Sequence, residues 1–556
     1  MSFVMSRREV LSCMAALTMT SRRGWAEIDA SIVKKNDRSL GEILERQETD
    51  SQSRWRGGCA DSWGLYPCGS AAQILHLGAA SYFHPESSYF KNARLFERMK
   101  LAAEFLERMQ NEQGNIDLLT TNFNSPPDTG FVVHRVANAA KLAALHEDRR
   151  ALELMENFLR RAGAGLAQGG IHTPNHRWVV CAALAQIHDI FPDERHLRRI
   201  DEWLAEGIDL DEEGQFIERS TTVYNPVCDY SLVVMADKLN RPELLAPVRK
   251  NLDAMLYLLH PNFEVVTEIS RRQDLNTRGG MERYWLPLRY MANHDGNGKY
   301  AAVLQSLEPD RISLPYMMEY PILQKTPPGP APVPDRYVKD YPLSEITRIR
   351  DGKTSATILH RGGSRWISIH RGEAVINAIR FASAFFGKGQ FVPERFEKRD
   401  GVYYFKQELR GPYYQPISDP NLLPVSRKTW GAARSHRRQS EVCAMTYEGS
   451  IKPKPDGFDL EINAHGTGGV PLAVEINLRE GGELTNVQPA PNVKDAYLLS
   501  QGYAAYRAGD DVVSIGPGRS EHAYTQIRGA EPKLPGVSVY VTGYTPFQHK
   551  LTIRWG

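Results

Sequence analysis

The sequence predicts a multidomain α+β protein in which a helical region is followed by a large antiparallel β region. From about residue 40 to 320, apolar residues recur at spacings of three and four, which indicates amphipathic helices. The segment 326–335 then contains five prolines, and beyond it apolar and polar residues alternate with a period of two. A chain of 556 residues is also too long for one ordinary core, so more than one domain is expected.

The helical region is expected over residues 29–325. Its clearest apolar face comprises Leu95, Phe96, Met99, Ala102, Phe105, Leu106 and Met109. Segments 152–162 and 252–259 repeat the pattern, and turn-rich segments at 122–130, 169–175, 209–225 and 260–280 separate the helices. Such a series of helices forms a bundle, a solenoid or a closed toroid, and the pattern alone does not choose among them.

The proline-rich segment 326–340 is expected to be an extended linker, because proline is excluded from helix interiors and central strands. Residues 341–556 are expected to form an antiparallel sheet or sandwich. Its strands are expected near 356–358, 366–369, 375–379, 402–405, 458–462, 472–476, 512–515, 537–541 and 551–555. The βαβ alternation of dinucleotide-binding folds is absent, as are a Walker loop and the G-x-S-x-G and H-E-x-x-H motifs.

The N-terminus predicts export. Arg7 and Arg8 are followed by a short apolar run from Leu11 to Met19, a pattern typical of a twin-arginine signal peptide. Residues 1–28 are therefore expected to be a leader, and the protein is expected to be periplasmic or secreted.

Charge and cysteine content exclude several classes of partner. The formal net charge is +2, which gives no overall attraction to nucleic acid, and no apolar run is long enough to span a membrane. The spacing of the six cysteines matches no zinc signature. Cys59 and Cys68 are close enough in sequence to pair, but most of the cysteines are expected to be small core residues.

The first candidate site cluster is the segment 170–178. Pro174 and Asn175 are expected to cap a helix whose first turn contains His176, Arg177 and Trp178. A helix N-terminus attracts anions, and a neutral histidine beside an amide donor suits a site that holds a carboxylate and moves a proton. Helix capping by Asn175 and core packing by Trp178 are the plain structural alternatives.

The second cluster spans 214–230 and contains Glu218, Tyr224 and Tyr230. The phenol of a tyrosine has an ordinary pKa of about 10, so it serves as an acid, or as a base when nearby cations lower that pKa. A tyrosine that packs with its hydroxyl group satisfied is the alternative.

The third cluster contains Glu268, Arg271 and Arg272, with Tyr284 nearby. Paired arginines bind a carboxylate in bidentate fashion, although an ion-paired surface explains such a run equally well.

Two further groups are weaker candidates. Asn124 and Asp128 lie in a turn suited to sugar hydroxyl groups, with His134 following, but turn chemistry explains the same residues. His360 and His370 lie on adjacent strand-like segments of the β region.

Together these features resemble the heparinase II/III-like polysaccharide lyases and the related toroid-fold alginate lyases. Asn175-His176 is similar to the family's Asn-His pair. The segment Gly214-x-Phe-x-Glu218-x-Ser220, ending at Tyr224, is similar to the segment that carries its catalytic tyrosine. Tyr224 and Tyr230 both fit the family's spacing, and Asn225 stands where many relatives have a histidine.

The resemblance implies an (α/α) toroid, an antiparallel β domain and cleavage of an acidic polysaccharide by β-elimination. Asn175, with Arg271 or Arg272, would hold the uronate carboxylate. His176 or Tyr224 would remove the C5 proton, and Tyr224 or Tyr230 would protonate the leaving oxygen. The implied substrate-binding residues are Arg271, Arg272, Asn124, Asp128, His134, Arg177, Trp178, Glu218, Tyr284, His360 and His370. No cofactor is required, and a structural divalent metal is compatible with the resemblance.

Two other functions fit the same sequence. A glycoside hydrolase on a similar helical toroid needs two opposed carboxylic acids, for which Asp128, Glu218 and Glu268 are candidates. A non-catalytic polysaccharide-binding protein would keep the Asn, Arg and aromatic residues without needing His176 and Tyr224 together.

Overall fold

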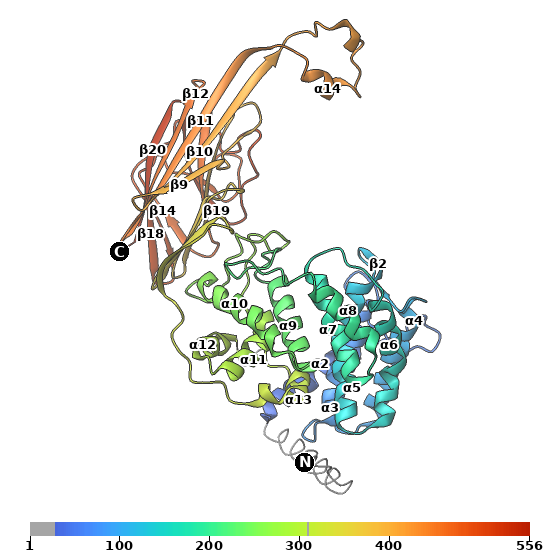
Figure 1. Cartoon of the computed structure of the whole chain (residues 1–556). Coiled ribbons are helices and arrows are strands. Elements are labelled where there is room, and N and C mark those ends of the chain that lie inside the picture. The colour runs from blue at the N-terminus through green and yellow to red at the C-terminus, as the bar shows by residue number, and fades with distance from the viewer. Residues whose placement is uncertain (1–27, 308–310, 556) are drawn as a thin grey trace, which may run out of the picture. The chain divides into compact units, whose positions relative to one another are not determined.

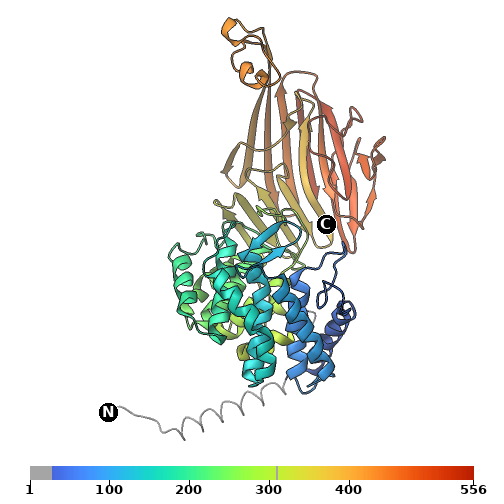
Figure 2. The same cartoon turned by 90° about the vertical axis from the view of Figure 1, so that its right-hand side faces the viewer.

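The computed structural model describes residues 28–307 and 311–555 and divides into two compact units (Figures 1 and 2). The helical unit comprises Met1–Leu258 and Phe263–Val333, and the β unit comprises Leu259–Asn262 and Pro334–Gly556. The expected leader lies outside the described residues except for its last position. No helix in the described ranges is long and apolar enough to cross a membrane.

In the described ranges, the helical unit consists of helices joined by loops, with one β-hairpin between α4 and α5. Its helices are α2 (Ala30–Glu45), α3 (Cys68–Phe83), α4 (Ala93–Met109), α5 (Pro126–Leu145), α6 (Arg149–Leu166), α7 (Asn175–Ile190), α8 (Glu194–Leu204), α9 (Tyr224–Lys238), α10 (Leu245–Met255), α11 (Trp285–Asp295), α12 (Gly298–Leu307) and α13 (Leu314–Glu319). The hairpin strands are β1 (Ile116–Leu118) and β2 (Asn122–Ser125).

The helices form a closed double ring. The inner helices α3, α5, α7, α9 and α11 each contact the next, and α13 contacts α3 and α5. The short 3-10 helix η4 (Pro321–Gln324) contacts both α11 and α13, so it completes the circle. The even-numbered helices α4, α6, α8, α10 and α12 pack against inner ones. The predicted (α/α) toroid is therefore confirmed (Figure 1).

Apolar patterning separates the inner helices from the outer ones. Helix α7 has 13 of its 16 residues buried, because it is covered on both sides. Helix α8 buries only His196 and Ile200, as expected of an amphipathic helix on the outside. Alanines in α5 and α7 allow the close approach of neighbouring inner helices.

Two local expectations are corrected, and a third, that most cysteines are small core residues, is confirmed for Cys59 and Cys68. The segment 122–130 is not one turn, because β2 ends at Ser125 and α5 begins at Pro126. Proline suits the first positions of a helix, where its missing N–H is not needed. The extended segment is also shorter than expected, since β3 already begins at Arg336. Cys59 and Cys68 are both buried and unpaired.

The β unit contains two large sheets. The first has the strand order β14-β17-β18-β20-β12-β11-β10-β9 and the second β15-β16-β19-β13-β7-β6-β5-β4-β3, with β8 paired to β7. The pairs are antiparallel except β16 with β19. The strands are β3 (Arg336–Tyr341), β4 (Ile346–Asp351), β5 (Thr354–Leu359), β6 (Ile367–Arg371), β7 (Ala374–Ser383), β8 (Gly389–Gln390), β9 (Arg395–Arg399), β10 (Val402–Tyr414), β11 (Gln439–Lys454), β12 (Gly457–Gly466), β13 (Pro471–Leu478), β14 (Glu483–Thr485), β15 (Gln488–Pro489), β16 (Ala496–Leu498), β17 (Ala504–Ala508), β18 (Asp511–Gly516), β19 (Val537–Tyr544) and β20 (Phe547–Arg554).

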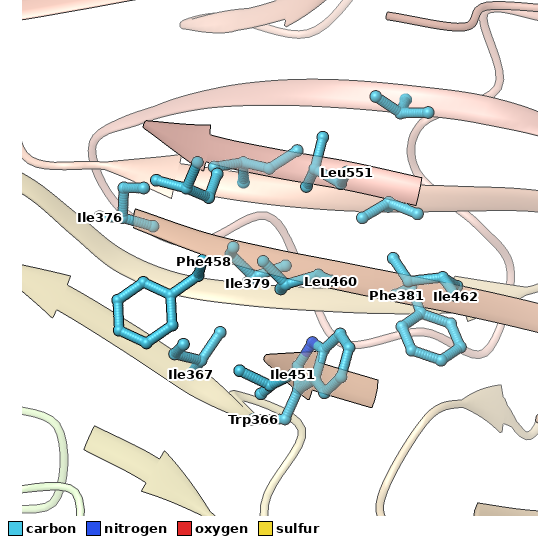
Figure 3. Packing of buried hydrophobic residues seen from close by; sticks show 14 of the residues in the cluster. Trp366, Ile367, Ile376, Ile379, Phe381, Ile451, Phe458, Leu460, Ile462 and Leu551 are labelled. Carbon is cyan, nitrogen blue, oxygen red and sulfur yellow. The ribbon is translucent and has the colours of Figure 1, made fainter. Parts of the chain in front are cut away.

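One hydrophobic core joins the two sheets. Alternate residues of β7, such as Ile379 and Phe381, meet residues of β12, such as Leu460 and Ile462 (Figure 3). Trp366 is fully buried beside them. This packing explains the period-two pattern of the sequence and confirms the predicted antiparallel β-sandwich.

Beyond the body of the β unit, strands β10 and β11 form a long hairpin. Their register runs from Tyr403 opposite Ile451 to Tyr414 opposite Gln439. The connecting residues 415–438, which we call the arm, contain the short helix α14 (Trp430–Arg434) and lie at the far end of this hairpin (Figure 1).

Candidate functional site

Two inner helices begin at the candidate site. Helix α7 starts with Asn175 and helix α9 with Tyr224, and neither has a side-chain cap. The capping role expected of Asn175 is wrong, because Pro174 occupies the N-cap position. The side chain of Asn175 is therefore available for a contact across the ring.

Asn175 and Glu218 join two segments of the ring. The Asn175 side-chain amide donates a hydrogen bond to the Glu218 carboxylate and a second one, 3.2 Å long, to the hydroxyl of Thr173. The other carboxylate oxygen of Glu218 lies 3.3 Å from Nε of Arg272. Asn175 and Glu218 are both buried, whereas the Arg272 side chain is 34% exposed. One buried carboxylate thus holds an amide and a partly exposed guanidinium group.

The same arginine lies against Tyr224. Its guanidinium carbon is 5.1 Å from the centre of the Tyr224 ring, and the Tyr224 hydroxyl accepts a 2.9 Å hydrogen bond from Gln273. Arg271 is exposed, and its backbone N–H donates to the carbonyl oxygen of Glu218. The structure therefore brings together residues from all three of the sharper sequence clusters.

Asp274 fixes the turn that precedes Tyr224. This buried carboxylate accepts hydrogen bonds from the hydroxyl groups of Ser220 (2.9 Å), Ser270 and Thr222 (3.0 Å), and from the backbone N–H of Thr222. Ser220 in turn accepts from the backbone N–H of Tyr224. Sequence reasoning missed the roles of Gln273 and Asp274, for which position directly after the arginine pair was the only signal.

His176 follows Asn175 and is held neutral. Burial, with smaller contributions from His172 and Arg272, lowers its pKa to about 4, although Asp128 acts in the opposite direction. Its ring packs edge-on against His172, with centroids 4.7 Å apart, and its Nδ1 is buried without a hydrogen bond. At neutral pH His176 is therefore an unprotonated imidazole within electrostatic reach of Arg272.

A wide groove borders the site at His172, whose ring packs against that of His176. Its volume is about 780 Å³, and it lies between the β1–β2 hairpin, the start of α5 and the segment before α7. Amide and hydroxyl side chains dominate its lining, Phe123 is 68% exposed in it, and Glu112 is its one formal charge. Its lining includes Asn122, Phe123, Asn124, Gln168 and His172.

Asn124 and Asp128 are partly accounted for by local structure. Asn124 accepts hydrogen bonds from the amides of Asn111 and Asn115, and Asp128 accepts from Asn122 and Ser125. Asn124 nevertheless lines the groove, whereas Asp128 mainly stabilises the start of α5.

A second cavity, of about 390 Å³, lies among α5, α9, α11 and α13. His134 and Tyr230 line it together with Arg135 and Arg283. His134 contacts the Gln186 side chain at 2.7 Å, and burial lowers its pKa to about 4. Burial raises the pKa of Tyr230 well above its ordinary value. A tyrosine in this state is a poorer proton donor than the partly exposed Tyr224.

Three predicted substrate contacts are wrong because their side chains are structural. Trp178 is fully buried and donates to Asp209, and Arg177 is buried in ion pairs with Glu206 and Asp209. Tyr284 is fully buried and donates a 2.6 Å hydrogen bond to a backbone carbonyl.

The two histidines of the β unit are also inside their unit. His360 is buried against the ring of Phe396 and contacts the Thr347 hydroxyl at 2.9 Å. His370 is buried in a parallel stack on His260, with centroids 3.5 Å apart. Both side chains have contacts inside the β unit, and their expected contact with a substrate stays a prediction.

The described residues contain no group of three His, Cys, Asp or Glu arranged to hold a metal ion.

No protein-family model and no curated protein matches the sequence. Solved structures do match its fold. A chondroitin AC lyase of Streptomyces coelicolor A3, in complex with chondroitin sulphate, has a TM-score of 0.55 at 12% identity and is matched over 97% of this chain and 83% of its own. A mutant of the heparan sulfate lyase HepC from Pedobacter heparinus has a TM-score of 0.52 at 11% identity, over 97% and 88%.

A third similar structure is a Paenibacillus xanthan lyase, with a TM-score of 0.56 at 10% identity. The match covers 95% of this chain but only 57% of the xanthan lyase. Identities this low show a shared fold alone. The chain thus has a fold found in polysaccharide lyases, which is a fold of carbohydrate-active enzymes.

Proposed function

We propose that this protein is a polysaccharide lyase that cleaves a uronic-acid polysaccharide by β-elimination, leaving a C4–C5 unsaturated uronate end. One observation carries the proposal: Arg272 contacts the buried Glu218–Asn175 pair on one side and the Tyr224 ring on the other. A carboxylate-binding cation is thus held beside a phenol that can transfer a proton.

Arg272 supplies the carboxylate recognition. Its Nε faces Glu218, while its terminal nitrogens make no hydrogen bond within the described part of the chain. A guanidinium group binds a carboxylate through two parallel hydrogen bonds. Neutralising the uronate C6 carboxylate in this way stabilises the negative charge that develops when the C5 proton leaves. Both hydrogens of the Asn175 amide are donated to Glu218 and Thr173, so Asn175 would assist by holding Glu218, and the exposed Arg271 would be a second cation for the carboxylate.

His176 and Tyr224 supply the proton transfers. His176 is unprotonated at neutral pH, so we assign it as the base that takes the C5 proton. The electron pair of that C–H bond forms the C4–C5 double bond, and the bond from C4 to the glycosidic oxygen breaks. The Tyr224 hydroxyl gives its proton to the leaving oxygen and recovers one from His176 or water. Tyr224 is favoured over Tyr230, whose hydroxyl is buried.

The groove favours a substrate with few sulfate groups. Its amide-rich lining suits sugar hydroxyls, the exposed ring of Phe123 suits the flat face of a sugar, and it presents no Lys or Arg to a sulfate. The chondroitin AC lyase relative was solved with a sulfated polymer. We propose that this chain acts instead on sparsely sulfated uronates, and that its twin-arginine leader exports it to the periplasm or beyond.

The hydrolase alternative is less well supported by the site. A glycosidase needs one carboxylic acid to protonate the leaving group and a second opposite it. Glu218 is instead bound by Asn175 and Arg272, and Asp128 by Asn122 and Ser125.

The decisive experiment is to follow near-ultraviolet absorbance while the purified protein is incubated with a panel of uronic-acid polysaccharides. We expect absorbance to rise on at least one polymer and to stop rising with Tyr224→Phe. Tyr503→Phe, at an exposed tyrosine of the β unit, is the matched control and should remain active. Release of reducing sugar without any absorbance change would show hydrolysis and exclude the lyase.

A further inference from the structure

The arm, residues 415–438, is the most cationic exposed segment of the β unit. It carries five cationic residues against the single acidic residue Asp419. The cationic residues are Arg427, Lys428, Arg434, Arg437 and Arg438. All but Arg437 are exposed, and none forms an ion pair with a carboxylate of the described residues.

Some cations elsewhere on the same sheet are neutralised. Lys406 on β10 lies 2.9 Å from Glu408 and 3.7 Å from Glu448 of β11. Lys550 on β20 is paired with Asp459. The arm differs from the rest of the sheet in the density of its cations, because five of them lie within its last twelve residues.

Internal contacts hold the arm in a defined conformation. Arg434 stacks over Tyr414 at 4.5 Å and Arg437 over Trp430 at 4.8 Å. The Arg437 guanidinium also donates to the carbonyl oxygen of Gln415, whose side chain donates to Ser440 on β11. Cations held in this way lose less conformational entropy on binding a ligand than cations on a flexible segment.

Aromatic rings accompany the charges. Trp430 and Tyr413 are each 58% exposed, and Phe386 is 42% exposed with its ring 5.6 Å from that of Tyr413. Exposed rings of this size on a surface commonly mark a binding site. Flat rings beside guanidinium groups match a chain of sugar rings that carry carboxylates.

We propose that the arm is a binding site for an anionic, carboxylate-bearing polysaccharide, additional to the candidate catalytic site. Arginines bind the carboxylates in bidentate fashion, and Trp430 packs against the sugar rings. A membrane surface fits less well, because α14 has only five residues and offers no apolar helix face to lie in a bilayer. This site does not depend on the proposed catalytic reaction.

The test measures binding of polygalacturonate, a polymer whose charges are all carboxylates, by the full chain carrying Tyr224→Phe to prevent cleavage. In that background, the variant Arg427→Ser, Lys428→Ser, Arg434→Ser and Arg438→Ser should bind at least tenfold more weakly. Its binding should also depend less on salt, because fewer ion pairs are screened. Trp430→Ala should weaken binding severalfold.

The matched control removes four exposed cations from helices α4 and α6 through Lys100→Ser, Arg149→Ser, Arg150→Ser and Arg160→Ser. It changes the net charge equally, so it should leave binding within about twofold of the parent. Arg427→Glu with Lys428→Glu serves as a second arm variant, because neither side chain makes a contact that stabilises the arm. Equal binding by arm and control variants would overturn the proposal. So would arm-dependent binding to anionic phospholipid vesicles without arm-dependent binding to polygalacturonate.

Discussion

The Glu218 carboxylate accepts a hydrogen bond from the Asn175 amide across 43 residues of sequence, and in doing so it links the segment before α9 to the first turn of α7. Because the same carboxylate lies beside Arg272, Glu218 connects Asn175 to the arginine that we assign to uronate recognition. A buried charge that loses its partner is costly, so the three side chains depend on one another.

Glu218→Gln is the first test of this arrangement. Glutamine preserves the size and one acceptor oxygen but removes the negative charge that orients Arg272. We expect kcat to fall at least tenfold while the protein remains folded. Glu212→Gln, at an exposed glutamate of the same segment, should retain full activity. Wild-type turnover by Glu218→Gln would exclude the assigned role, and circular dichroism would verify folding.

Asp274→Asn tests positioning without touching a reacting group. Asp274 accepts four hydrogen bonds around the turn before Tyr224, and an amide replaces one acceptor oxygen with a donor. We expect a loss of about 1–3 kcal/mol in the free energy of unfolding, because buried hydrogen-bonding groups are left unsatisfied. A positioning role also predicts a fall in kcat with little change in KM. If kcat and KM change by the same factor, or if neither changes, Asp274 does not have a positioning role.

Much of the fold was predictable from the sequence, because helix and strand periods differ and the prolines mark the change. The closure of the ring was not predictable from periodicity. It depends on the six-residue helix α13 and on η4, which are too short to show a pattern. Strand β11 was also missed, since its first half is largely exposed and its second half is interrupted by Gly449 and Pro453.

The candidate site was predicted in part. Local sequence signals led to Asn175, His176 and Tyr224, because a helix start concentrates such residues. The same segment also predicted substrate contacts for Arg177 and Trp178. Both side chains instead contact Asp209, and the sequence does not show which side of an inner helix faces that residue. Gln273 reaches Tyr224 across 49 residues, a relationship that only the folded chain reveals.

The stability of the protein should fall in mild acid. Burial lowers the pKa of His134 to about 4 and that of His76 to about 3, from an ordinary value of 6.5. Below pH 6.5 the unfolded chain binds protons that the folded chain does not. The two neutral histidines therefore cost no stability above pH 6.5. As the pH falls from 6.5 towards 4, proton binding by the unfolded chain lowers the free energy of unfolding.

Urea unfolding at pH 7.5 and 4.5 measures this effect. The loss of stability between the two pH values should be smaller in His134→Gln than in wild type by about 2 kcal/mol, given about 1.4 kcal/mol per unit of pKa shift. The exposed His294 provides the control, and His294→Gln should lose as much stability as wild type. The same loss in His134→Gln would show that this histidine does not carry the effect.

The groove leads to a prediction about specificity. Since its lining contains no Lys or Arg, a sulfate bound there would lose its hydration without gaining a cationic partner. Wild-type enzyme should therefore cleave an unsulfated uronate polymer faster than its sulfated counterpart of equal length. Gln168→Lys places a cation at an exposed position of the lining and should shift the ratio of kcat/KM values towards the sulfated polymer. A tenfold shift corresponds to about 1.4 kcal/mol.

The matched control is Gln52→Lys, which adds the same charge at an exposed position that does not line the groove. An equal shift in both variants would mean that overall charge, rather than the groove, sets the preference. Phe123→Ala completes the test, because loss of a ring that packs on a sugar should raise KM for both polymers while leaving their ratio unchanged. If Gln168→Lys changes the ratio and Phe123→Ala does not, charge selection and sugar stacking are separate properties of one groove. If the wild-type protein instead prefers the sulfated polymer, cations from elsewhere on the chain must bind the sulfate groups. That result would exclude the groove as the determinant of specificity.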